Sequence, residues 1–267
     1  MENALAVQEL FPALRSGCED AGQLILAFER RRCVSITRLC LGASFCGSLF
    51  NAAARPQFDF FGAYCRDSGL KVSLAVPVFT QRELARGKEI IDELLREYGD
   101  VIDEAAVNDP GMYRWLRGRF AGKLFAGRLM NKVNRDPRYP EYGEGAVLVP
   151  RPPVAVSGIE LDACASHMIV EDGDELTVCV YTPYSYISTG KICSFASLYA
   201  DAFQKFAPAP SCPVNCGKYY VRHECRDKVD FYHIGNAVYY PSELPRISGA
   251  AQLRAIWFPL ELWEVRE

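Results

Sequence analysis

The chain has 267 residues, of which 49% are hydrophobic and 24% charged, and its 30 basic and 33 acidic residues give a net charge of −3. This is the composition of an ordinary globular protein, and the length allows one large domain or two small ones. We interpret residues 1–267 as a single domain. The small net charge excludes a protein that attracts nucleic acid through its overall charge, although a local basic patch could still bind it.

Charged residues interrupt the N-terminal segment, where Glu2, Glu9, Arg15, Glu19 and Asp20 break any apolar run. We therefore expect no signal peptide. No uninterrupted apolar stretch is long enough to cross a bilayer, so we expect no membrane span and a cytoplasmic protein. In that reducing compartment the eleven cysteines should be metal ligands or free thiols rather than disulfides.

Helices and strands alternate through the first half of the chain. A near-continuous apolar run over 71–79 indicates a strand buried on both faces. Thr80 and Glu83 form a capping box for the helix that follows, and Asp109 can cap a short helix in which Pro110 is the first residue. The predicted elements are two short helices within 4–32, strands at 33–41, 71–79 and 101–107, and helices at 57–68 and 80–98.

The second half is less regular. The predicted elements are a short strand and basic loop within 123–138, a Pro/Gly-rich excursion at 140–153, strands at 154–161, 167–170 and 176–181, a helix from Cys193 to about Phe206, and strands at 219–222, 231–233 and 237–240. Strands that alternate with helices at this density predict an α/β fold with a parallel sheet. The number of units favours a (β/α) TIM-like barrel, incomplete or decorated, with a cysteine-rich C-terminal region.

The cysteines of residues 179–225 are the sharpest chemical signal. Cys212 and Cys216 lie three residues apart on a Pro-containing turn, Cys193 lies upstream, and Cys225 lies just downstream. Thiolates bind soft metals, and the metal itself drives their deprotonation. Four thiolates suit a cubane iron–sulfur cluster or a structural zinc ion, and their spacing does not separate the two.

A second candidate site is a basic segment in the middle of the chain. Arg128 and Lys132, oriented by Asn131, could hold the carboxylate or phosphate of a small anionic substrate. The alternatives are a patch that contacts RNA and a solvated basic loop. The basic residues of this segment are Arg114, Arg117, Arg119, Lys123, Arg128, Lys132, Arg135 and Arg138.

Three other polar residues are weaker catalytic candidates. Asn108 and Asp109 could orient a substrate, although helix capping already explains Asp109. Asp162 shares a strand face with Glu160 and could line a barrel mouth. The sequence has no phosphate-binding glycine loop, no GxSxG and no HExxH motif. A protease needs an activated nucleophile or a metal-bound water, and these motifs supply neither.

Several separate motifs resemble those of the U32 family, long described as collagenase-like peptidases. The motifs, in order, are VNDPG (107–111), AGRLMNK (126–132), RDPR (135–138), YTPYSYISTGKICSF (181–195) and FYHIGNAVYY (231–240). The resemblance covers roughly residues 33–240. The pattern is most similar to the small members that include the oxygen-independent ubiquinone-biosynthesis accessory proteins, which carry a [4Fe-4S] cluster.

The resemblance implies a ligand set and a function. Cys46, in the Leu-Gly-x-x-x-Cys context of 41–46, would be the first ligand, and Cys193, Cys212 and Cys216 would be the others. The spacing from Cys193 to Cys212 is longer than in the family pattern, and Cys225 could replace Cys46. The implied function is an oxygen-independent hydroxylation or related redox modification of a quinone precursor or an RNA base, alone or with a second U32-like protein. The alternatives are a U32 peptidase and a non-catalytic barrel that binds RNA or protein.

Overall fold

A computed structural model supplies the fold. It describes residues 1–15, 18, 20–131, 146–152, 154–171, 173–198, 201, 212–225 and 229–264, without the side chains of 263 and 264. Lys132, the basic loop after it and most of the segment between Cys193 and Cys212 therefore lie outside the described residues.

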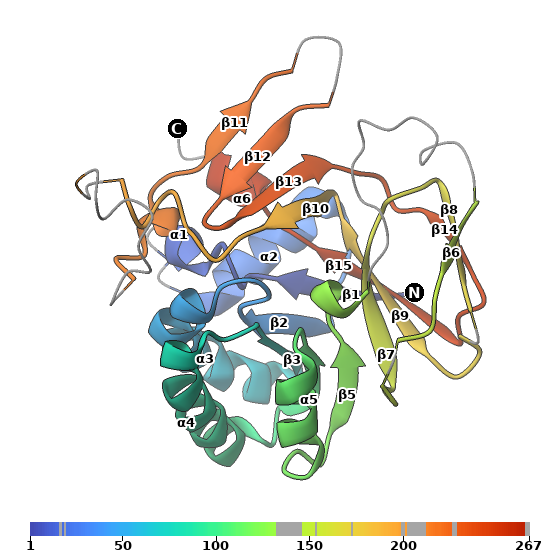
Figure 1. The fold of residues 1–267 in the computed structure, drawn as a ribbon, viewed down its shortest axis with the longest axis horizontal. Coiled ribbons are helices and arrows are strands. Elements are labelled where there is room, and N and C mark those ends of the chain that lie inside the picture. Colours follow the sequence, from blue (N-terminus) through green and yellow to red (C-terminus); the bar gives the residue numbers. More distant parts are fainter. Residues whose placement is uncertain are drawn as a thin grey trace.

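Eight parallel strands form a closed barrel in the order β1-β15-β9-β7-β5-β4-β3-β2 (Figure 1). They are β1 (Glu2–Ala6), β2 (Arg38–Gly42), β3 (Lys71–Val76), β4 (Ile102–Val107), β5 (Lys123–Ala126), β7 (Gly158–Asp162), β9 (Thr177–Thr182) and β15 (Gln252–Trp257). The expected α/β class and TIM-like barrel are confirmed. The barrel is closed, so of the two expected forms it is the decorated one and not the incomplete one.

Helices cover the outside of the barrel (Figure 1). They are α1 (Phe11–Arg15), α2 (Ala21–Arg32), α3 (Gly47–Ser68), α4 (Gln81–Tyr98), α5 (Pro110–Arg117) and α6 (Glu261–Glu264), with 3-10 turns η1 (Arg128–Met130) and η3 (Asn215–Gly217). The capping box of Thr80 and Glu83 begins α4, and Asp109 caps α5 with Pro110 in its first turn, as predicted. None of the helices in the described part of the chain is long and apolar enough to cross a membrane.

The two ends of the chain differ from the prediction. Residues 4–6, predicted as helix, belong to β1, which pairs with β15 on one side and β2 on the other. The β15 strand was not predicted at all. Pairing between strands some 250 residues apart in the sequence fixes both elements, and local residue preferences do not reveal such pairing. The helix predicted from Cys193 is also wrong where it is described, because 194–198 form turns.

Two additional sheets decorate the barrel, and Figure 1 shows them on different sides of it. One is antiparallel, in the order β10 (Tyr184–Thr189), β13 (Ala237–Pro241), β12 (Phe231–Ile234) and β11 (Val221–His223); the other is parallel, in the order β14 (Arg246–Ser248), β8 (His167–Val170) and β6 (Ala146–Val149). The four-stranded sheet follows the carboxyl end of β9 almost directly, which brings the C-terminal cysteines toward that end of the barrel.

Charged side chains fill much of the barrel interior. Arg254 of β15 binds Glu104 of β4, with Nη1–Oε2 at 2.6 Å, although these strands are not neighbours in the barrel. The contact therefore crosses the interior. Arg254 also binds Glu2 at 2.7 Å, and Arg38 lies 3.2 Å from Glu104. Branched apolar residues usually fill this space, so a buried ion-paired layer distinguishes this barrel.

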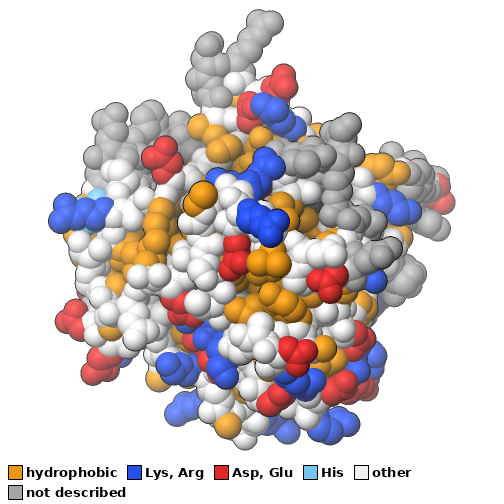
Figure 2. Space-filling view, turned by 180° about the vertical axis from the view of Figure 1, so that it is seen from behind, with side chains coloured by type: hydrophobic (Ala, Val, Ile, Leu, Met, Phe, Trp, Pro, Cys, Tyr) orange, Lys and Arg blue, Asp and Glu red, His pale blue; other side chains and the backbone are white. Residues whose placement is uncertain are grey.

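Charged side chains also lie on the exterior of the molecule. In Figure 2, basic and acidic side chains of the described residues are intermingled over the face that is seen. Several form exposed ion pairs, among them Arg55–Asp59 and Arg66–Asp100, both with an N–O distance of 2.7 Å.

Candidate functional site

The loops at the carboxyl ends of the barrel strands carry the candidate residues. Glu9 follows β1, Cys46 follows β2, Asn108 follows β4, and Arg128 follows β5, while Asp162 is the last residue of β7. Parallel strands of a barrel end at the same mouth, and TIM barrels place their active sites there. The fold therefore brings together residues that are far apart in the sequence.

A small cavity of about 10 Å³ collects the four predicted ligands. Its lining consists of Cys46, Cys193, Cys212 and Cys216 together with Glu9, Leu49, Ile234, Gly235 and Asn236. This volume has room for about one water molecule. The four thiols come from the barrel, from the segment after β10, and from the turn before β11.

The thiols face one cavity, but they do not stand at ligand distances. Within the described ranges, no group of three or more His, Cys, Asp or Glu side chains is close enough to hold a metal ion. The donor chemistry nevertheless fits a soft metal centre, because four thiols are the ligand set of cubane clusters and of structural zinc.

Cys46 occupies a position that favours a thiolate. It is the N-cap of α3, and its Sγ accepts a hydrogen bond from the backbone N–H of Leu49 at 3.3 Å. The positive end of a helix stabilises a thiolate. Burial works in the opposite direction and raises the pKa of Cys46 to about 12.

Burial also raises the pKa of Cys212 and that of Cys216. Without a cation these three cavity thiols are therefore protonated at neutral pH. A metal that binds here must displace their protons, which couples its affinity to pH.

The turn that carries Cys212 and Cys216 is held in an unusual conformation. Val214 has φ 55° and ψ 34°, in the left-handed region that β-branched residues rarely adopt. Its backbone N–H donates to the Sγ of Cys212 at 3.4 Å. This geometry turns both cysteines toward the cavity within five residues.

Two amide side chains fasten the cavity segments to one another. Asn215 donates from Nδ2 to the carbonyl of Phe195 at 2.9 Å, which joins the turn to the Cys193 segment. Asn236 donates to the carbonyls of Phe45 at 3.1 Å and Gly190 at 2.7 Å. Sequence reasoning missed both asparagines, because only the fold shows which carbonyls lie within their reach.

Cys225 lies apart from the other candidates. It follows β11, its backbone N–H donates to Asp230 Oδ1 at 3.3 Å, and it does not line the cavity. Cys40, Cys65 and Cys179 are buried in the hydrophobic core.

Arg128 lies inside the barrel rather than at its surface. It is fully buried and binds Asp162 through two hydrogen bonds, Nε–Oδ2 at 3.1 Å and Nη2–Oδ1 at 2.5 Å. Its Cζ lies 3.6 Å from the centroid of the Tyr181 ring and 4.8 Å from that of Phe45. Asp162 supplies the anion for this guanidinium, so a substrate carboxylate or phosphate would have to compete with it.

The neighbouring candidates make structural contacts. Asn131 is buried, and its Nδ2 donates to the Glu160 carbonyl at 2.7 Å. Asn108 accepts from the Leu129 N–H at 2.9 Å. Asp109 accepts from the Met112 N–H at 2.8 Å as the cap of α5. These contacts show how the loops after β4 and β5 are held together.

Two buried acids adjoin these residues. Glu9 accepts from the Ser44 N–H at 2.6 Å through Oε1, and Glu160 accepts from the Tyr181 hydroxyl at 3.4 Å. The second carboxyl oxygen of each acid has no hydrogen-bond partner among the described residues. Burial raises the pKa of Glu9, and it raises that of Glu160 to about 7. No motif or spacing singles out Glu9 in the sequence.

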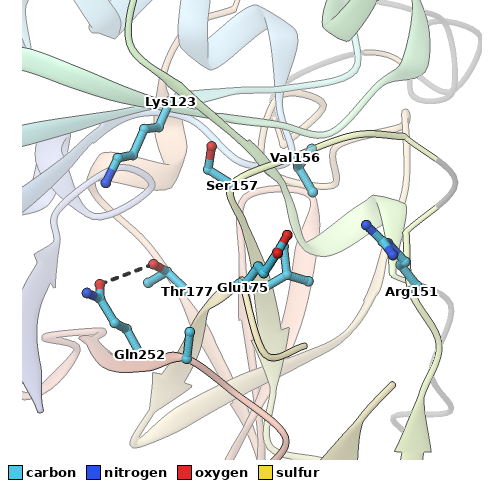
Figure 3. A pocket seen from close by; sticks show the side chains of 9 residues that line it. Lys123, Arg151, Val156, Ser157, Glu175, Thr177 and Gln252 are labelled. Carbon is cyan, nitrogen blue, oxygen red and sulfur yellow. Dashed lines mark hydrogen bonds between the residues drawn. The ribbon is translucent and has the colours of Figure 1, made fainter. Parts of the chain in front are cut away.

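A larger cavity of about 420 Å³ opens at the opposite end of the barrel (Figure 3). Lys123, Thr177 and Gln252, at the starts of β5, β9 and β15, line one part of it, and Thr177 donates to Gln252 at 3.4 Å. Arg151 and Glu175 reach it from loops, and both are exposed. The amino ends of barrel strands usually serve stability rather than catalysis, so we place the candidate site at the cysteine-lined end.

The fold and the small cysteine-lined cavity define the class of protein. It is an α/β TIM-like barrel with a cysteine-lined cavity at the carboxyl ends of its strands. No protein-family model, no curated protein and no solved structure matches the chain. None of these comparisons confirms the resemblance to the U32 family, which rests on the sequence motifs; the structure shows the TIM-like fold alone.

Proposed function

We propose that Cys46, Cys193, Cys212 and Cys216 bind a [4Fe-4S] cluster, and that the protein takes part in an oxygen-independent hydroxylation or related redox modification. The quinone precursor or RNA base named by the family resemblance is its substrate class. The observation that carries the proposal is the convergence of these four thiols, from segments far apart in the sequence, on one cavity at the barrel mouth.

The surroundings of the cavity support a redox centre. A bound cluster would supply one-electron transfer, and its potential depends on burial and on hydrogen bonds to the sulfur atoms. The chain offers both, because Cys216 is buried and backbone N–H groups already donate to Cys46 and Cys212. Asn215 and Asn236 would hold the ligand segments in place. Zinc remains the alternative occupant, and a second U32-like protein remains the proposed partner.

Anaerobic purification followed by iron and sulfide analysis and EPR spectroscopy tests the centre. We expect about four iron and four sulfide ions per chain and an EPR signal on reduction. The double variant Cys212→Ala/Cys216→Ala should lose both ions. Cys225→Ala is the matched control and should keep them, because Cys225 lies outside the cavity. One zinc ion without sulfide, or full iron in the double variant, contradicts the proposal.

Mass spectrometry tests the reaction. Anaerobic cells that make the wild-type protein or the double variant are compared for quinone precursors and RNA nucleosides that are heavier by one oxygen atom. We expect the heavier species only with the wild-type protein. Peptide cleavage by purified, metal-defined protein that persists in the double variant would instead support the peptidase alternative.

A further inference from the structure

Among the described residues of the barrel interior, Arg38, Arg128 and Arg254 each form ion pairs with carboxylates, whereas Glu160 forms none. Arg254 binds Glu104 and Glu2, and Arg128 binds Asp162. The strand register places Glu160 between these pairs. Glu160 is level with Cys179, and Cys179 is level with Arg254, while Asp162, the partner of Arg128, lies two residues further along β7. No described Lys or Arg forms an ion pair with Glu160.

The Glu160 carboxyl group accepts fewer hydrogen bonds than that of Asp162, two residues along the same strand. Asp162 accepts two hydrogen bonds from Arg128 and a third from the Tyr186 N–H at 2.9 Å. Glu160 accepts one long bond from Tyr181 through Oε1, its Oε2 has no partner within the described residues, and it is 2% exposed. A buried carboxylate with so little compensation holds a proton readily, and the pKa of Glu160 is raised to about 7, mainly by burial.

The ionisable groups around Glu160 come from several strands. Those that face it are Arg128 after β5, Asp162 on its own strand, Cys179 and Tyr181 on β9, Arg254 on β15 and Cys40 on β2. Burial raises the pKa of Cys40, of Cys179 and of Tyr181, so all three are neutral near pH 7. Glu160 is the member of this set that can change its charge near pH 7.

Buried polar groups connect Glu160 with the cysteine cavity. Tyr181 donates to Glu160, and the Arg128 guanidinium lies 3.6 Å from the centroid of the Tyr181 ring and 4.8 Å from that of Phe45. Phe45 precedes the cavity residue Cys46, and the Tyr239 ring lies 6.2 Å from the Phe45 ring. The Glu9 Oε2 and the Tyr239 hydroxyl have spare hydrogen-bonding capacity among the described residues. A change of charge at the cavity is therefore transmitted to Glu160 through a low-dielectric region.

We propose that Glu160 binds the proton that accompanies one-electron reduction at the cysteine-lined cavity and releases it on reoxidation. This inference rests on the proposed function, which supplies the redox centre. An external one-electron donor, such as a reduced flavin or iron–sulfur protein, provides the electron. The Glu160 carboxylate takes one proton from solvent and forms a carboxyl O–H bond, so the net charge of the interior is conserved. Reoxidation returns the proton to solvent.

Redox titration followed by EPR at several pH values tests the coupling. The midpoint potential of the wild-type protein should fall as pH rises through neutrality, by up to about 59 mV per pH unit, which is the value of a tenfold change for one electron. Glu160→Gln keeps an oxygen acceptor for Tyr181 but cannot take a proton, and its potential should be nearly independent of pH. Glu175→Gln, an exposed carboxyl at the opposite cavity, is the control and should keep the wild-type slope. An unchanged slope in Glu160→Gln overturns the proposal.

Infrared spectroscopy of the cluster-free protein gives a second, independent readout. In the wild-type protein, the C=O band of a protonated carboxyl should disappear as the pH is raised through neutrality. This titration should be missing in Glu160→Gln. A spectrum in which no carboxyl titrates near neutral pH overturns the role of Glu160 even if a cluster binds. Failure of the wild-type protein to bind any reducible centre overturns the proposed function instead, so the two failures are distinguishable.

Discussion

At the scale of single residues, a substitution of Arg128 distinguishes a structural role of this side chain from a substrate-binding role. Lysine at this position would keep the positive charge but lose the two-point contact with Asp162 and the stacking on Tyr181, and a hydrogen bond to a charged group typically contributes about 1.5–3 kcal/mol. We expect Arg128→Lys to lower the free energy of unfolding, measured by denaturant titration, by that amount. Arg66→Lys, in an exposed pair with Asp100, should have little effect. Native stability with impaired binding of an anion would favour the substrate role.

The ionisation of Glu160 should be visible in the pH dependence of stability. Its pKa in the folded protein is raised to about 7 from an ordinary value of 4.5, so the folded state binds the proton more tightly than the unfolded state. The stabilisation is complete below pH 4.5 and is lost as pH rises through 7. Relative to wild type, Glu160→Gln should gain stability between pH 5 and pH 8 by at most about 3 kcal/mol. A pH-independent difference between the two proteins would contradict this.

Val214 carries backbone strain between two cavity cysteines. A left-handed conformation costs a non-glycine residue about 1–2 kcal/mol. Substitution by glycine removes this cost but lowers the free energy of unfolding by about 0.4–1 kcal/mol, because glycine increases the conformational entropy of the unfolded chain. Val214→Gly should therefore leave the thermal midpoint of the cluster-free protein unchanged or slightly higher. Val221→Gly, in the exposed strand β11, is the control and should lower it. Equal losses in both variants would show that Val214 is not strained.

At the scale of elements, local signals predicted some parts of the fold and not others. The capping box of α4 and the Asp109–Pro110 start of α5 are written within a few neighbouring residues, and both were found where expected. β1 and β15 pair with each other and thereby close the barrel, with Glu2 level with Arg254. No window of neighbouring residues contains that pairing, so composition and periodicity could not reveal it.

The same distinction applies to the candidate site. The cysteines that line the cavity were expected from their spacing and from the family resemblance, because thiols are rare and their chemistry is specific. Glu9 and Asn236 look like ordinary polar residues in the sequence, and they acquire a role only because β1 ends and β13 begins beside the same cavity. Arg128 was expected to bind a substrate anion. The structure pairs it with Asp162, which comes from another strand, and the sequence does not show that pairing.

The start of α3 joins the barrel to the candidate metal centre. Cys46 caps this helix and also faces the cavity, so the two roles can be separated by substitution. Cys46→Ser should keep the cap, because serine is a favoured N-cap residue, while it removes the soft ligand. We expect nearly normal thermal stability of the cluster-free protein with a large loss of iron. Full iron content in Cys46→Ser would show that Cys46 is not a ligand.

At the scale of the whole molecule, the candidate centre draws on two parts of the fold. The barrel contributes Cys46, and the region beyond β10 contributes the other three cysteines. A bound centre would therefore tie the C-terminal region to the barrel mouth. Ligands that bind only the folded state stabilise it, and the gain concentrates in the segments they order.

Hydrogen–deuterium exchange can locate this effect. Comparison of cluster-loaded and cluster-free protein should show slower exchange on loading at 190–198, at 212–217 and at the first turn of α3. β3 and β4, whose strands pair with each other within the barrel, should exchange equally slowly in both forms. The double variant Cys212→Ala/Cys216→Ala, treated with the same iron and sulfide, should show no protection. Protection confined to the barrel, with none at 212–217, would place the centre elsewhere, because ordering of the ligand turn is the direct consequence of binding through Cys212 and Cys216.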